Sequence, residues 1–177
     1  MQTLSFRKLL AAVAVLCAFI TPGYAEPSER KRKADIGFVE IDKEITLRRM
    51  VVHNARLKGT VLFLHGFPET LYAWKDIALA LADDYEVHAF DWPGYGLSSR
   101  PTVDRFSYAP KDYARVLGEY VRKAGIDTSR LTIYATDIGA LPVLLLALEK
   151  SDIARTIIVG DSPRSTDRVT CTRACKA

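Results

Sequence analysis

Histidine and cysteine are scarce in this chain of 177 residues, which holds three of each. The histidines stand at positions 53, 65 and 88, so none follows position 88. Cys171 and Cys175 lie in a polar C-terminal segment with no histidine nearby, and a metal site there would need further ligands. We therefore expect no metal and no cofactor, whereas pairing of Cys171 with Cys175 in an oxidising compartment stays open.

The central part of the chain lacks the positive charge that the ends carry. The formal net charge is +4, but residues 34–161 contain 15 basic and 18 acidic residues. A nucleic-acid surface should belong to the folded domain. Because the basic excess belongs to the two ends, we expect no nucleic-acid partner.

No apolar run is long enough to span a membrane as a helix. The longest, Leu9–Ile20, has 12 residues, and a hydrocarbon core of about 30 Å needs about 20. Two basic residues precede it, and Gly23 and Ala25 supply small residues at the −3 and −1 positions of a cleavage site. Residues 1–25 are thus predicted to be a signal peptide, and residues 26–35 a flexible, polar mature N-terminus. The product would be exported, periplasmic or secreted, without a stable membrane anchor; an uncleaved anchor is the alternative.

From residue 36 the hydrophobic pattern changes repeatedly between the periods of strands and helices, which predicts an α/β fold. Such alternation is typical of a mostly parallel sheet with helices on both faces. The pattern stops after Asp161, so we expect a domain over 36–161, cut after about the sixth strand, and a disordered tail over 162–177. The expected strands are Phe38–Ile41, Ile45–His53, Thr60–Leu64, Glu86–Phe90, Leu131–Ala135 and Thr156–Val159, and the expected helices are Leu71–Asp83, Ala109–Ala124 and Ile138–Lys150.

Three segments, each directly after a predicted strand, carry the residues of chemical interest. They are His65–Thr70 (HGFPET), Asp91–Ser99 (DWPGYGLSS) and Ile133–Gly139 (IYATDIG). In this order and spacing they resemble the α/β-hydrolase family, and the likeness runs from about residue 36 to residue 161. The resemblance implies that the third segment is the nucleophile elbow, with Asp137 at the nucleophile position.

The elbow explains why its neighbours are small. A strand that turns sharply into a helix can lift one side chain clear of the sheet only between small residues, here Ala135 and Gly139. The family's usual serine is replaced by Asp137, which disfavours a serine esterase. A carboxylate near a helix N-terminus stays ionised and can attack a saturated carbon without a neighbouring base. The alternative is that Asp137 only caps the helix.

An aspartate nucleophile resembles the epoxide hydrolase and haloalkane dehalogenase branch of the family. There the backbone N–H groups of Phe67 and Ile138 would form the oxyanion hole. Dehalogenases usually have tryptophan after the nucleophile, and Ile138 cannot donate a side-chain hydrogen bond. Epoxide chemistry is therefore favoured over haloalkane chemistry.

Other conspicuous residues are expected to be structural. His65 should brace the oxyanion turn, and Asp91 should shape the loop that follows it. We expect His53 and His88 to be structural because both lie in predicted strands. Trp74 and Trp92 are expected in the core or the pocket lining.

A hydrolase of this type needs a late histidine, oriented by an acid, to activate water. No histidine follows Asp137, so both partners stay unassigned. The chain is therefore expected to be inactive on its small-molecule substrate, an epoxide or a halogenated compound. Family members often continue from Asp161 as Asp-Phe-Ala-Pro-Phe-Asp-Arg-Pro, and a one-base deletion there would give a frameshifted tail. The alternatives are a non-catalytic binding protein of this fold and a truncated pseudogene product; the oligomeric state stays open.

Overall fold

The computed structural model describes residues 33–54, 58–160 and 170–172. The expected signal peptide, most of the N-terminal segment over 26–35 and most of the tail over 162–177 lie outside these residues. Cys175 also lies outside them, so its pairing with Cys171 stays open. No helix in the described ranges has both the length and the apolar character that a membrane span requires.

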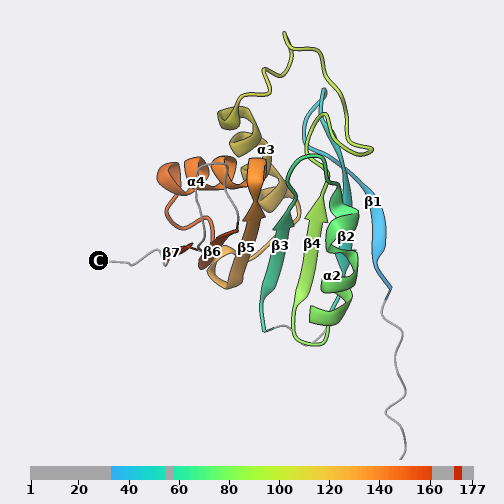
Figure 1. Ribbon diagram of the computed structural model, residues 1–177, viewed down its shortest axis with the longest axis vertical. Helices are drawn as coiled ribbons and strands as arrows, with labels where there is room; N and C mark the ends of the chain where they lie inside the picture. Colours follow the sequence, from blue (N-terminus) through green and yellow to red (C-terminus); the bar gives the residue numbers. More distant parts are fainter. Residues whose placement is uncertain (1–32, 55–57, 161–169, 173–177) are drawn as a thin grey trace, which may run out of the picture. The chain divides into compact units, whose positions relative to one another are not determined.

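A seven-stranded sheet forms the centre of the described part of the chain, in the order β1-β2-β4-β3-β5-β6-β7 (Figure 1). Strands β3 to β6 run parallel, whereas β1, β2 and β7 each pair with a neighbour in the antiparallel sense. The strands are β1 (Asp35–Glu40), β2 (Thr46–Val52), β3 (Thr60–Leu64), β4 (Glu86–Phe90), β5 (Leu131–Thr136), β6 (Thr156–Gly160) and β7 (Thr170–Thr172). The helices are η1 (Leu71–Trp74), α2 (Lys75–Leu81), α3 (Pro110–Lys123), η2 (Thr128–Arg130), η3 (Asp137–Gly139) and α4 (Ala140–Glu149).

The predicted α/β class is confirmed, and each of the six predicted strands is found. All five residues of β3 are buried, as expected for a central strand covered by helices on both faces. The predicted helix over 71–83 is instead a short 3₁₀ turn, η1, followed by α2. The predicted helix from Ile138 begins two residues later, because a 3₁₀ turn occupies Asp137–Gly139.

Strand β7 was not expected, because no strand pattern is visible in the polar tail. Its three residues pair antiparallel with Ile157, Ile158 and Val159 of β6. Strand β6 therefore pairs with β5 on one side and with β7 on the other.

Two hydrophobic clusters pack against opposite faces of the sheet. The larger contains Leu117 and Val121 of α3 with Val143 and Leu146 of α4, and these two helices lie side by side (Figure 1). The smaller contains residues of η1 and α2 against the other face. There Trp74 is buried and its ring stacks on Phe63 at 4.8 Å, which confirms its expected core position.

The register of the parallel strands brings the three motif segments together. Leu64, the last residue of β3, pairs with Phe90 at the end of β4 and with Ala135 near the end of β5. The segments that follow these strands therefore leave the sheet at the same edge, where ligands of open α/β sheets bind.

Candidate active site

Asp137 is the first residue of the sharp turn between β5 and α4. Its φ of +47° lies in the left-handed region, which residues other than glycine seldom adopt. A side chain at Gly139 would bring a Cβ atom to 3.0 Å from the carbonyl oxygen of His65 and 3.3 Å from Cβ of Leu64. Gly139 thus lets the turn pass close to the end of β3.

The carboxylate of Asp137 is held by the loop after β3 and does not cap its own helix. The backbone N–H of Phe67 donates to Oδ2 of Asp137 at 2.8 Å. The residue at the N-cap of the 3₁₀ turn is Thr136, and that of α4 is Gly139. The capping interpretation of Asp137 is therefore wrong.

Gly66 allows this approach between the loop and the carboxylate. A Cβ atom at position 66 would lie 2.7 Å from Cβ of Asp137 and 3.0 Å from its Oδ2. Real Cβ atoms do not approach other atoms so closely, so a larger residue would displace the loop or the carboxylate. The N–H of Gly66 donates to Oε2 of Glu69 at 3.3 Å, which helps to close the loop.

His65 supports the loop after β3 through hydrogen bonds of its ring, as predicted. Its buried ring places Nδ1 at 2.8 Å from the carbonyl oxygen of Gly66, and its Nε2 accepts the backbone N–H of Trp92 at 3.2 Å. Both contacts are satisfied by the neutral ring with its proton on Nδ1. Burial lowers the pKa of His65 and so favours that neutral form.

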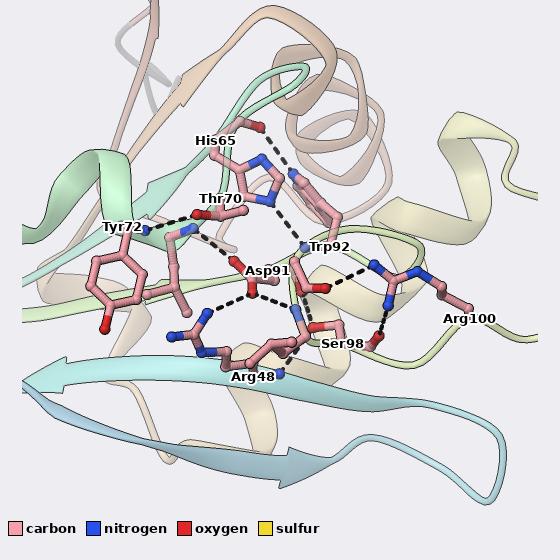
Figure 2. A network of polar contacts seen from close by, with 11 residues as sticks. Arg48, His65, Thr70, Tyr72, Asp91, Trp92, Ser98 and Arg100 are labelled. Atoms are coloured by element: carbon pink, nitrogen blue, oxygen red, sulfur yellow. Dashed lines mark hydrogen bonds and ion pairs between the residues drawn. The ribbon is translucent and has the colours of Figure 1, made fainter.

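Asp91 is the centre of a buried polar network behind the loop (Figure 2). Its carboxylate accepts the N–H of Leu71 at 2.7 Å and that of Leu97 at 3.0 Å, and it lies 3.7 Å from Nη1 of Arg48. The hydroxyl of Ser98 donates to the carbonyl oxygen of Asp91 at 2.6 Å. Asp91 thus has the structural role predicted for it, and it fixes the segment over 91–99 to the start of η1.

An open pocket of about 530 Å³ lies beside Phe67 and Ile138, the neighbours of the Asp137 carboxylate. Rings dominate its lining, which consists of Phe67, Gly94, Tyr95, Tyr108, Pro110, Tyr113, Ile138 and Pro142. Sequence reasoning missed Tyr95, Tyr108 and Tyr113 as pocket residues. The Gly94–Gly96 motif holds Tyr95 and was the available signal.

The other two histidines lie away from this pocket. Nδ1 of His53 is 3.2 Å from Oε2 of Glu86, and Nε2 of His88 is 2.9 Å from its Oε1. Glu86 stands at the start of β4, in register with Leu131 through β3. It is therefore about the length of β5, roughly 20 Å, from the turn at Asp137. The structural roles expected for both histidines fit this placement.

Phe67 and Ile138 line one pocket, and Asp137 lies beside them through its hydrogen bond to the Phe67 N–H. The oxyanion role of the N–H of Ile138 stays a prediction. Among the residues that the structure describes, no group of three or more potential ligand side chains could hold a metal ion.

Known proteins are similar to much of the described part of this chain. The family profile described as alpha/beta hydrolase fold matches residues 59–169. Haloalkane dehalogenase 2 of Mycobacterium tuberculosis is 34% identical over 102 residues, which are 58% of this chain and 34% of the relative. Epoxide hydrolase 1 of Caenorhabditis elegans is 28% identical over 125 residues, which are 68% of this chain and 30% of the relative.

A solved structure is also similar to this chain. The Cfl2 protein of Burkholderia cenocepacia superposes with a TM-score of 0.64 at 26% identity, over 75% of this chain and 45% of that protein. The chain spans about a third of the length of the two curated relatives. The chain belongs to the alpha/beta hydrolase fold family, and it resembles the haloalkane dehalogenases and epoxide hydrolases within it.

Proposed function

We propose that Asp137 is the covalent nucleophile of a hydrolase that forms an alkyl ester with a small epoxide or haloalkane. The observation that supports this most strongly is the hydrogen bond from the Phe67 N–H to Oδ2 of Asp137, made at a strained turn beside the pocket. It fixes one carboxylate oxygen and leaves the other without a hydrogen bond from the described residues.

That second oxygen would attack a saturated carbon of the substrate. As the new C–O bond forms, the carbon–halogen bond or an epoxide C–O bond breaks, and its electron pair leaves with the halide or the epoxide oxygen. When water later attacks the ester carbonyl, negative charge develops on the carbonyl oxygen. If that oxygen is Oδ2, the Phe67 N–H already lies at oxyanion-hole distance from it. Because Ile138 offers no side-chain donor for a departing halide, we place epoxides before haloalkanes.

The second step needs a base that none of the three histidines supplies. Both ring nitrogens of His65 are engaged with Gly66 and Trp92, and His53 and His88 bind Glu86 near the opposite end of the strands. We therefore propose that a protein of these 177 residues accumulates the ester and does not turn over.

Mass spectrometry of the intact chain tests the nucleophile. Incubation with a terminal epoxide should add one epoxide mass per protein molecule, and peptide mapping should place it on Asp137. Asp137→Ala should take up none at this peptide. Asp76→Ala, which removes an exposed carboxylate from the first turn of α2, is the matched control and should react as the original chain does. Binding of the epoxide without any adduct would instead favour a non-catalytic binding protein of this fold.

We also propose that the protein is exported after removal of residues 1–25. N-terminal sequencing of the protein recovered from an exporting host should then begin at Glu26. A mature protein that still begins with the apolar run would contradict cleavage and favour the uncleaved anchor.

A further inference from the structure

Three tyrosines line the pocket, and their hydroxyl groups differ in one respect. The hydroxyl of Tyr108 donates to the carbonyl oxygen of Pro101 at 2.6 Å, and that of Tyr113 donates to the carbonyl oxygen of Pro93 at 3.2 Å. The hydroxyl of Tyr95 has no hydrogen-bond partner among the described residues. It is therefore the one phenol of the three that can donate to a bound molecule.

The ring of Tyr95 is held in place from several sides. It makes edge contacts with the rings of His65 and Phe67, at centroid distances of 5.4 and 6.5 Å. Its backbone N–H donates to the carbonyl oxygen of Trp92 at 2.9 Å. The glycines on either side have φ values of +88° and +48°, a turn that other residues adopt only with strain. The buried network of Asp91 anchors the same loop through the Leu97 N–H.

The electrostatic surroundings keep this phenol protonated. Burial, followed by the negative charge of Asp137, raises the pKa of Tyr95. The ring of Phe67 contacts the Tyr95 ring, and the backbone N–H of Phe67 donates to Asp137, so Phe67 connects the two groups at this pocket. No lysine or arginine belongs to the described lining, so Tyr95 has no cationic competitor there for an electron-rich group.

We propose that the hydroxyl of Tyr95 is the hydrogen-bond donor to the leaving group in the ester-forming step, which rests on the function proposed for Asp137. The carboxylate forms the new bond to carbon while the leaving group takes the electron pair of the bond that breaks. With a haloalkane, the Tyr95 O–H donates to the departing halide ion and keeps its proton. With an epoxide, the ring oxygen becomes an alkoxide and takes the Tyr95 proton, and the phenolate then recovers a proton from water.

The test compares leaving groups in the full 177-residue chain and in Tyr95→Phe. Ester formation at Asp137 is followed by mass spectrometry with alkyl chlorides, bromides and iodides that share one alkyl group. Chloride is the poorest leaving group and depends most on a donor. Removal of the hydroxyl should slow the chloride about tenfold and the iodide about threefold or less. Because the Tyr95 hydroxyl has no partner in the part of the chain that the structure describes, Tyr95→Phe should melt at the same temperature as the original chain.

Tyr108→Phe is the matched control, because it removes a hydroxyl that is already donated to a carbonyl group. Tyr108→Phe should change the rates of ester formation with the alkyl chloride and the alkyl iodide by the same factor. A general loosening of the pocket loops would have the same effect. An equal effect of Tyr95→Phe on all three halides would overturn the leaving-group role while the nucleophile stood. No adduct of the original chain with any of the halides or with a terminal epoxide would instead refute the function proposed for Asp137, and the role of Tyr95 with it.

Discussion

Replacement of Asp91 by alanine should destabilise the fold strongly, although Asp91 is not proposed to touch the substrate. The side chain is fully buried and accepts two backbone N–H groups at 2.7 and 3.0 Å. Its charge is matched by Arg48, whose side chain is 13% exposed, at 3.7 Å. Alanine would leave the N–H of buried Leu71 without an acceptor and the guanidinium without its partner.

The expected loss follows from these contacts. A hydrogen bond to a charged acceptor contributes about 1.5–3 kcal/mol, and a buried N–H that is left unpaired costs about 1–3 kcal/mol. The N–H of Leu97 belongs to an exposed residue, so water can replace part of that bond. Breaking a buried ion pair by removing one partner costs about 3–5 kcal/mol. These contributions overlap, and we expect a total loss of about 3–5 kcal/mol in the free energy of unfolding.

Urea unfolding of the original chain and of Asp91→Ala measures this difference, provided that the two slopes agree. Asp91→Asn keeps the shape and one acceptor oxygen, so it should lose less than Asp91→Ala. Asp76→Ala, on the exposed side of α2, should change the unfolding midpoint little. A loss below about 1 kcal/mol for Asp91→Ala would refute the structural role derived for the network.

Three further outcomes are expected. Gly66→Ala would place a methyl group 2.7 Å from Cβ of Asp137 and so displace the carboxylate or the loop. Mass spectrometry should then show ester formation slowed about 100-fold. An unchanged rate would contradict the close approach of Gly66 to Asp137. Burial lowers the pKa of His65 and of His88 from the ordinary 6.5. The unfolded chain therefore binds more protons than the folded one, and the free energy of unfolding should fall as the pH drops below about 6.5. A urea midpoint that stayed constant under acidification would contradict this. Bromoacetate should esterify Asp137 about tenfold more slowly than a neutral bromoalkane. The described pocket lining offers no cation, and Asp137 repels a second carboxylate. Equal rates of ester formation, followed by peptide mapping, would count against this.

Much of the fold could be predicted because the signals are local. β3 is an uninterrupted run of apolar residues between short polar segments, and all five residues prove to be buried. The elbow could be located because a strand, a sharp turn and a helix each leave their own pattern around Asp137. The position of Phe67 near that carboxylate was implied by the resemblance to the epoxide hydrolase and haloalkane dehalogenase branch, and the hydrogen bond to Asp137 agrees with it.

The contacts that connect distant segments could not be predicted in the same way. The bond from the Leu71 N–H to Asp91 joins residues 20 positions apart, and nothing in either segment encodes that pairing. In the sequence, Tyr95 is only one residue of a loop motif. The sequence does not reveal whether the Tyr95 hydroxyl has an internal hydrogen-bond partner. Strand β7 escaped prediction for a related reason: three residues are too few to establish a period of two.

The backbone at Asp137 distinguishes the two roles that its sequence allowed. A capping aspartate adopts an extended backbone and accepts an N–H from the first turn of its own helix. Asp137 has a φ of +47° and accepts an N–H from a residue 70 positions earlier. The left-handed conformation costs about 1–2 kcal/mol in a residue with a Cβ atom, and a cap would not require it. Strain of this kind persists where the surrounding structure holds a side chain in a functional position, and here Gly66, Gly139 and the loop braced by His65 provide the close packing that holds it.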